Sequence, residues 1–206
     1  LDISLASTKV LVINCEGKVP QEAMEKVRQW VVRGGYLIST DWTLHSFVEK
    51  AFPNTIAWNL GKTPGNVVDA VILDNDSALL KGVGVQRAPW KLDEESQMVK
   101  VLRPDIVHIL ACSRKLGTMD TNRNLTSDQN QWGILACEFP FGRGRVLHLV
   151  GHYDYNSPLT FTRYILPDAI PGAGIGLRQA ISTNFLLEGL NRPTRTAVSP
   201  LDQSGR

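Results

Sequence analysis

The chain lacks any apolar run that approaches the roughly 20 residues needed to cross a bilayer, so we expect no membrane span in it. It also lacks an excess of charge of either sign, because 22 Lys+Arg and 20 Asp+Glu residues give a formal net charge of +2 without a basic cluster. We therefore do not expect nucleic acid as a partner. An initiator Met and a signal-peptide pattern are absent, and we expect that upstream sequence precedes Leu1.

Cysteine is scarce, and no CxxC pair is present. The three cysteines are Cys15, Cys112 and Cys137, and each closes or lies within an apolar strand-like run. This predicts buried free thiols rather than a disulfide scaffold or a structural zinc site. Unpaired thiols favour an intracellular, reducing compartment, with an excised secreted domain as the alternative.

The composition that is present, 43% hydrophobic and 20% charged, is typical of an ordinary globular protein. The length of 206 residues suits one domain that can bury a stable core without disulfide bonds or a structural metal. We predict an α/β domain over residues 1–192 and a poorly ordered C-terminal tail over 193–206.

The first 51 residues predict a β-α-β-α unit. Lys9–Asn14 is a nearly continuous apolar run of the kind found in parallel strands. A helix follows over Pro20–Arg33 with Val27 and Trp30 on its inner stripe, then a strand over Tyr36–Ser39 and a helix over Thr43–Ala51. Such alternation indicates an α/β sandwich, flavodoxin-like, with a mostly parallel sheet.

The rest of the chain is less regular. We predict strands at 67–73 and 106–112, short helical or irregular pieces at 77–81 and 93–98, and a surface loop over 117–131. The segments 133–139 and 145–150 predict a late antiparallel hairpin joined by Pro140-Phe-Gly-Arg-Gly144. A long loop over 159–176 and a final helix over 177–190 complete the prediction.

Polar groups follow three of the predicted strands. They are Asn14-Cys15-Glu16, Ser39-Thr40-Asp41-Trp42 and Gly151-His152-Tyr153-Asp154. Ligands of open α/β sheets bind at the carboxyl ends of the strands. If the strands are parallel neighbours, these groups meet at one edge, where Asn14, Cys15, Thr40 and Trp42 are candidate ligand-binding residues.

The order of several loose motifs resembles the class I glutamine amidotransferase-like superfamily. Leu11-Val-Ile-Asn-Cys15, the helix that closes with Val32-Arg-Gly-Gly35, and Tyr36-Leu-Ile-Ser39 resemble its core. Asp69-Ala-Val-Ile-Leu-Asp74 with Ser77-Ala-Leu-Leu-Lys-Gly82, and Gly142-Arg-Gly-Arg-Val146 leading to Gly151-His152, are more similar to its trehalose-utilisation-like branch. The resemblance covers roughly residues 5–190. It implies an amidotransferase-like sandwich that lacks the superfamily's first β-α unit, so that an upstream segment or a second copy would cover a sheet edge.

The resemblance also implies where a catalytic triad would lie. The nucleophile elbow of true amidotransferases, Gly-x-Cys-x-Gly, falls on Ser39-Thr40-Asp41-Trp42-Thr43. The cysteine is absent, and so are both glycines that allow the strained turn. The His-x-acid element has a counterpart in His152 and Asp154, so Asp41, His152 and Asp154 are the candidate catalytic residues.

Each candidate has a structural alternative. In these alternatives Asp41 caps the helix that follows it, and His152 is a structural histidine whose ring nitrogens are hydrogen-bonded within the protein. Asp154 stabilises a turn. Trp42 would line a pocket mouth or pack in the core. His148 and His152 are four residues apart, but on a strand this places them about 13 Å apart, so we expect no metal site. No motif calls for a cofactor.

Two functions follow from these residues. The first is a non-catalytic amidotransferase-like domain that acts in ligand binding or protein assembly, with an unidentified small molecule or protein as partner. The second is a hydrolase that uses Asp41, His152 and Asp154 on a substrate that the branch resemblance alone suggests is carbohydrate-related. A distance near 3 Å between the Asp41 carboxylate and the His152 ring, with an enclosed cleft, would favour the second.

Overall fold

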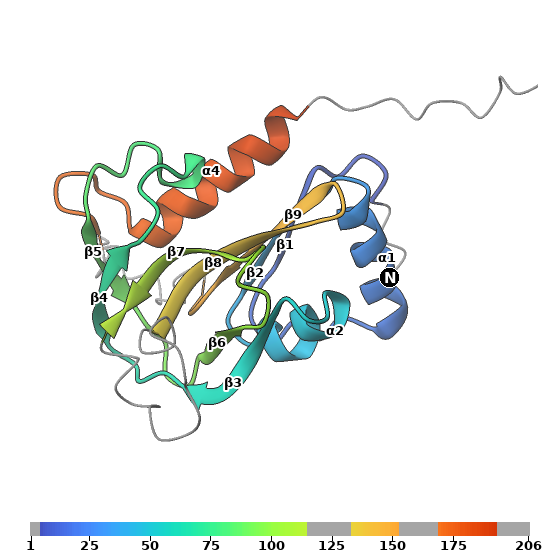
Figure 1. Ribbon diagram of the computed structural model, residues 1–206, viewed down its shortest axis with the longest axis horizontal. Helices are drawn as coiled ribbons and strands as arrows, with labels where there is room; N and C mark the ends of the chain where they lie inside the picture. The colour runs from blue at the N-terminus through green and yellow to red at the C-terminus, as the bar shows by residue number, and fades with distance from the viewer. Residues whose placement is uncertain (1–4, 115–132, 153–168, 193–206) are drawn as a thin grey trace, which may run out of the picture.

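The computed structural model describes residues 5–114, 133–152 and 169–192. In these residues a seven-stranded sheet has the order β1-β2-β9-β8-β7-β4-β5, and a smaller sheet pairs β3 with β6 (Figure 1). The strands of the main sheet are β1 (Val10–Ile13), β2 (Tyr36–Thr40), β4 (Val67–Ile72), β5 (Arg87–Lys91), β7 (His108–Ser113), β8 (Gly133–Phe141) and β9 (Gly144–Leu149). Those of the smaller sheet are β3 (Ile56–Lys62) and β6 (Gln97–Val101).

Helices lie on both faces of the main sheet. They are α1 (Gln21–Val32), the π-helix η1 (Leu44–Val48) that runs into α2 (Glu49–Ala51), the short 3-10 helix η2 (Ala78–Leu80), and α4 (Leu177–Asn191). In Figure 1, α4 crosses one face of the sheet while α1 and α2 lie on the other. This confirms the predicted α/β sandwich and its helices near residues 20–33, 43–51 and 177–190.

The main sheet is mixed. β1, β2 and β9 are paired in parallel, whereas β9-β8, β8-β7, β7-β4 and β4-β5 are antiparallel pairs. From this pairing, β1, β2, β9, β7 and β5 point in one direction, and β8 and β4 in the other. The predicted late hairpin is confirmed by β8 and β9. Its turn needs Gly142, which has φ 60° and whose added Cβ would lie 2.7 Å from the Val32 Cα.

The inner stripe of α1 packs on the sheet as predicted, since Val27, Trp30 and Val31 are all buried. Pro20 precedes the first helical residue, where the missing N–H costs no hydrogen bond. The Trp30 ring covers Gly35, where an added Cβ would approach the ring to 2.3 Å. The Gly34-Gly35 pair therefore ends the helix and makes room for its largest core side chain.

The sequence did not predict β3, β5 or β6, and the irregular piece expected over 93–98 is wrong at its end, where Gln97 and Met98 begin β6. The first three residues of β6 are buried, because it packs against η1 and β8, so it carries no alternating pattern. β5 contains Pro89, which argues against a strand. It is tolerated because β5 is an edge strand of the sheet.

Several predictions fall outside the described residues. These are the loop over 117–131, the tail over 193–206 and most of the loop over 159–176, of which Ala169 and Gly176 form an isolated bridge. The division into a domain over 1–192 and a tail stays a prediction.

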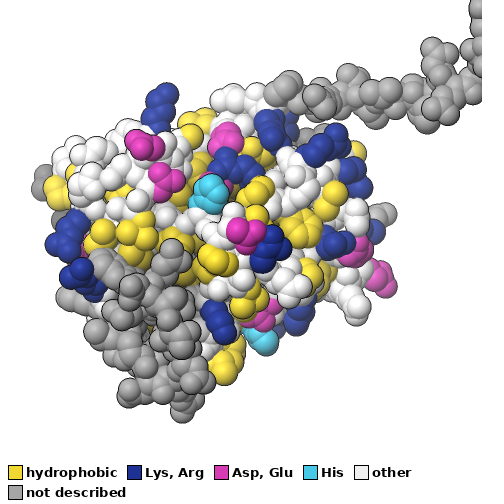
Figure 2. All heavy atoms as spheres, in the orientation of Figure 1, with side chains coloured by type: hydrophobic (Ala, Val, Ile, Leu, Met, Phe, Trp, Pro, Cys, Tyr) yellow, Lys and Arg dark blue, Asp and Glu magenta, His cyan; other side chains and the backbone are white. Residues whose placement is uncertain are grey.

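β1 forms one edge of the main sheet. None of the helices in the described ranges has the length and apolar character to cross a membrane. On the face in Figure 2, basic and acidic side chains are interspersed.

Candidate functional site

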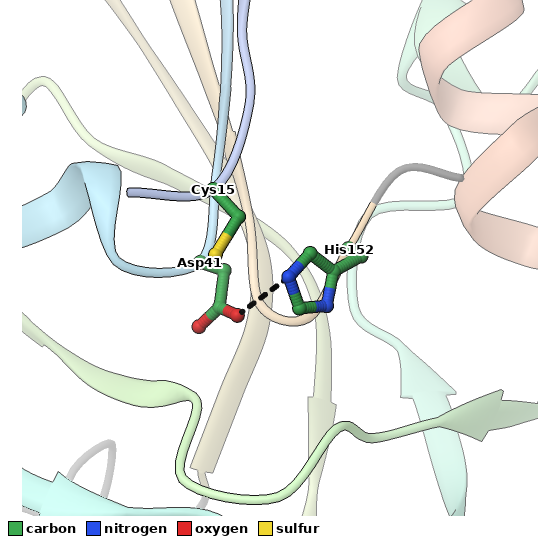
Figure 3. A group of neighbouring side chains, drawn as sticks. All are labelled: Cys15, Asp41 and His152. Carbon is green, nitrogen blue, oxygen red and sulfur yellow. Dashed lines mark ion pairs between the residues drawn. The ribbon is translucent and has the colours of Figure 1, made fainter. Parts of the chain in front are cut away.

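Three neighbouring parallel strands, β1, β2 and β9, deliver their carboxyl ends to one edge of the sheet. Cys15, Asp41 and His152 follow these strands, and their ligand atoms all lie within 4.8 Å of one another. Figure 3 shows the three side chains close together on three separate segments, with the Asp41 carboxylate and the His152 ring facing each other. The predicted proximity of Asp41 and His152 is confirmed, with 3.6 Å between Asp41 Oδ2 and His152 Nε2.

Asp41 occupies a strained turn between β2 and the following helix. Its φ is 49°, in the left-handed region that aspartate tolerates better than most residues. Its amide donates to the Leu149 carbonyl at 3.0 Å, and its own carbonyl accepts from the Leu44 amide at 3.0 Å. The strained turn thus exists without the flanking glycines. The backbone carbonyl, not the carboxylate, accepts the hydrogen bond that begins the helix.

The Asp41 carboxylate is buried, with only 1% of the residue exposed. Its Oδ1 has no hydrogen-bond partner among the described residues. Burial raises the pKa of Asp41, and the nearby His152 only partly opposes this. A buried carboxylate with one oxygen unpaired is costly, because each unsatisfied buried polar group loses about 1–3 kcal/mol. Such groups are concentrated where a protein has a function to serve.

Asp93 fixes His152, and the sequence did not identify it. Asp93 Oδ2 accepts a hydrogen bond from the His152 amide at 2.7 Å and lies 3.0 Å from ring Nδ1. With Nδ1 facing Asp93, Nε2 faces Asp41. Asp93 follows β5, which points the same way as β9, but β8, β7 and β4 lie between these two strands, so strand order alone does not predict its contact with His152. Pro89 made β5 hard to recognise in the sequence, because proline is rare within strands.

Burial raises the pKa of Asp93, but the His152 ring and amide, together with Arg178, outweigh burial, and the net pKa is lowered. Arg178 is a buried residue of α4 that donates to the His152 carbonyl and lies 5.0 Å over the Trp90 ring. Gly151 has φ 83°, and an added Cβ would come within 3.1 Å of both Asp93 Oδ2 and Arg178 Nη1. A side chain at position 151 would therefore disturb the support of His152.

Cys15 lies in a tight turn after β1. Glu16 and Gly17 have φ values of 71° and 48°, and an added Cβ at Gly17 would lie 2.4 Å from Thr43 Cγ2. This close approach places Cys15 beside Asp41. Burial raises the pKa of the Cys15 thiol, and the Asp41 charge raises it further. The other two cysteines are fully buried, as predicted, whereas Cys15 is only half-buried.

The remaining predicted residues are spread around this cluster. Thr40 Oγ1 donates to Asn14 Oδ1, which ties the end of β2 to that of β1. Trp42 is 40% exposed, so it does not pack in the core, and its Nε1 donates to the Glu95 carbonyl at 3.0 Å. Asp154, the third predicted catalytic residue, lies outside the described residues.

His148 does not join the cluster. It is fully buried on β9, with Nδ1 3.0 Å from Ser39 Oγ. Burial lowers the pKa of His148 to about 3, so the ring stays neutral at physiological pH. This agrees with the sequence argument that His148 and His152 do not chelate one ion.

No known protein family and no curated protein matches the chain. The solved structures that match parts of the chain include a bacterial cytoplasmic protein and two putative ThuA-like proteins. A cytoplasmic protein from Salmonella typhimurium is 13% identical with a TM-score of 0.49, and the match covers 87% of this chain and 71% of that one. A putative ThuA-like protein from Bacteroides uniformis is 12% identical with a TM-score of 0.49, covering 88% and 66%.

Other solved structures are longer than this chain. The chain covers 61% of a putative ThuA-like protein from Parabacteroides merdae (12% identity, TM-score 0.46, 71% of this chain). It covers 18% of a β-galactosidase from Bacillus circulans (11% identity, TM-score 0.41, 68% of this chain). The chain thus spans less than two thirds of the length of these two proteins. Likenesses this distant carry no argument about function.

Proposed function

We propose that this chain is a non-catalytic, ligand-binding domain with an amidotransferase-like fold, and that its site is the cluster of Cys15, Asp41 and His152. The observation that carries this proposal is the buried Asp41 carboxylate, which has one oxygen without a hydrogen-bond partner among the described residues. Its other oxygen lies 3.6 Å from His152, longer than the contact near 3 Å that would favour the hydrolase. An unpaired buried oxygen costs stability. A ligand that satisfies it offsets that cost, which explains why the cluster is present at the ligand-binding edge of the sheet.

Covalent amide chemistry is not supported by the thiol that is present. Thiolate attack needs a cysteine of low pKa on the elbow. Here the elbow position is Asp41, and Cys15 follows the neighbouring strand with a raised pKa. On this proposal the site occupies the position of an amidotransferase centre and lacks its nucleophile.

A hydrolase is the second candidate, and one observation favours it. Asp93 orients the His152 ring, and that ring faces the carboxylate of Asp41, which lies on a strained turn. In such a reaction Asp41 would attack an electrophilic carbon and expel the leaving group, and His152 would take a proton from the water that cleaves the ester. Asp93 takes the orienting role that the sequence assigned to Asp154. A carbohydrate-related substrate is suggested by the resemblance alone.

A fragment library screened by protein-observed NMR tests the binding function without assuming a ligand. We expect hits whose amide shift changes centre on residues 14–16, 41–43 and 93–97, and which Asp41→Asn weakens. His108→Gln is the matched control, because His108 is exposed on β7. Hits confined to other surfaces would contradict a binding function for this cluster.

Nitrophenyl esters and nitrophenyl glycosides separate the two candidates. The binding function predicts no turnover above the buffer rate. Turnover that Asp41→Asn abolishes and His108→Gln retains would instead establish the hydrolase. Mass spectrometry of a trapped ester on Asp41 would then identify the nucleophile.

A further inference from the structure

We propose that Cys15, Asp41 and His152 bind one divalent transition-metal ion of the zinc class. This inference rests on the proposed binding function, because it names the ligand of the same cluster. The three side chains come from the ends of three neighbouring parallel strands, and their ligand atoms lie within 4.8 Å of one another.

The distance between Asp41 and His152 fits two ligands of one ion. At 3.6 Å, Asp41 Oδ2 and His152 Nε2 are too far apart for a direct hydrogen bond. Metal–oxygen and metal–nitrogen bonds of about 2.0–2.2 Å in a tetrahedral site place two ligands about 3.3–3.6 Å apart. The pair is therefore spaced as co-ligands. The three ligand atoms lie within 4.8 Å of one another. For the Cys15 sulfur to bind the same ion, its distance to the other two ligand atoms has to shorten by about 1 Å at most, which side-chain rotation can provide.

Asp93 supplies the support that metal-binding histidines usually have. It accepts from the His152 amide at 2.7 Å and lies 3.0 Å from Nδ1, which leaves Nε2 directed toward Asp41. A carboxylate on the far nitrogen of a metal-bound histidine fixes the tautomer and makes the ring a better ligand. The backbone of His152 is held as well, because its carbonyl accepts from the buried Arg178.

The burial of Asp41 gives independent support. Asp41 is 1% exposed, and its Oδ1 has no hydrogen-bond partner in the described part of the chain. An ion held by Oδ2, the oxygen that faces His152, would compensate the buried negative charge of the whole carboxylate. Asp41 and a Cys15 thiolate would together contribute two negative charges, which match a divalent ion, and His152 would bind as the neutral imidazole.

The donor set indicates which metal. Mg²⁺ and Ca²⁺ prefer oxygen ligands, whereas a thiolate with an imidazole and a carboxylate favours Zn²⁺ or a similar transition metal. Three protein ligands leave one position of a tetrahedron for water or for an oxygen of a second ligand, as in zinc sites that are not purely structural. The metal would thus be the group to which a small molecule binds.

Sequence spacing could not reveal this site. The ligands lie at positions 15, 41 and 152, and none has a second ligand within four residues in the cluster. Only the parallel pairing of β1, β2 and β9 brings them together. The sequence expectation of no metal site was drawn from the spacing of His148 and His152, and the structure places His148 beside Ser39 and away from this cluster.

Cobalt(II) titration of the reduced full chain tests the proposal, because Co²⁺ replaces Zn²⁺ and gives a visible spectrum. We expect one equivalent to bind with a thiolate-to-cobalt charge-transfer band, and Zn²⁺ to displace it. Cys15→Ser removes the band, Asp41→Asn and His152→Gln weaken binding, and Asp93→Asn, which changes no ligand, weakens it by about 10–100-fold. His108→Gln binds as the wild type does.

The possible failures are distinguishable. Absence of the charge-transfer band, or a band that persists unchanged in Cys15→Ser, would overturn the metal site. If fragments still bind at residues 14–16 and 41–43 in that case, the binding function stands without the metal. If neither metal nor fragments bind there, both proposals fail. Circular dichroism of each variant verifies that lost binding is not lost folding.

Discussion

Asp93 binds His152 at two points, because its Oδ2 accepts from the backbone amide at 2.7 Å and lies 3.0 Å from ring Nδ1. One carboxylate oxygen thus fixes both the chain direction after β9 and the plane of the imidazole. Any chemistry at Nε2, whether metal binding or proton transfer, depends on this contact. Asp93 is a positioning residue in either case.

We therefore predict that Asp93→Asn loosens the His152 ring. Nitrogen-15 NMR of the ring should show the tautomer protonated at Nδ1 in the wild type and a mixture of tautomers in the variant. The free energy of unfolding should fall by about 1.5–3 kcal/mol, the usual value for hydrogen bonds to a charged group. Asp105→Asn, which changes an exposed carboxylate paired with Arg103, should change the free energy of unfolding much less than Asp93→Asn does. Equal effects of the two substitutions would contradict the prediction.

The protein should not hydrolyse glutamine. The reaction needs a thiolate with a histidine in reach. The strand-to-helix turn carries Asp41 instead of a cysteine, and Cys15, on its own turn after β1, has a raised pKa. A coupled assay for ammonia should give the same rate with the protein and with buffer. Ammonia release that Cys15→Ala abolishes would show that Cys15, and not position 41, is the nucleophile position.

The N-terminal half of the fold was predictable because its signals are local. The helix over Pro20–Arg33 has an apolar stripe at helical spacing and a Gly-Gly stop, and both strands beside it are short apolar runs. β3 and β6 were not predictable, because each is stabilised by the other and by η1 rather than by a pattern of its own. β5 was not recognised because it contains Pro89, and proline is tolerated mainly in edge strands such as this one.

The site was predictable as far as strand order allowed. Parallel neighbours place their carboxyl ends together, so Asp41 and His152 could be assigned to one edge. Asp93 could not, because no motif precedes it and its strand was not recognised. The joint position of Cys15 and Asp41 also depends on Gly17, whose contact with Thr43 is visible only in three dimensions.

Two tryptophans should respond differently to truncation. Trp30 is 5% exposed on the inner stripe of α1, and its Nε1 donates to the Thr8 carbonyl at 2.9 Å. Trp30→Ala should lower the free energy of unfolding by about 3–5 kcal/mol, the usual cost of deleting a large core aromatic. Trp42 is 40% exposed, so Trp42→Ala should cost about 1 kcal/mol, chiefly its hydrogen bond to Glu95. Urea unfolding of both variants measures the difference, and similar midpoints would contradict this assignment of the core.

His148 should make the protein less stable in mild acid. Burial lowers its pKa to about 3 in the folded state, against 6.5 when it is exposed. Between these values the unfolded chain binds a proton that the folded chain does not, so stability falls as the pH decreases from about 6.5. The slope from this one group approaches about 1.4 kcal/mol per pH unit.

Comparing the wild type with His148→Gln by chemical denaturation between pH 4.5 and 6.5 isolates this effect. The lowered pKa of Asp93 acts below that window, and the raised pKa of Asp41, which makes stability increase as the pH falls, acts in both proteins. The loss of stability per pH unit should be smaller in His148→Gln by about 1 kcal/mol. His108→Gln, which replaces an exposed histidine of β7, is the matched control variant. Ring NMR of the wild type gives a direct reading, since His148 should remain neutral at pH 5. A protonated His148 signal from folded protein at that pH would contradict the argument, whatever the behaviour of the variants.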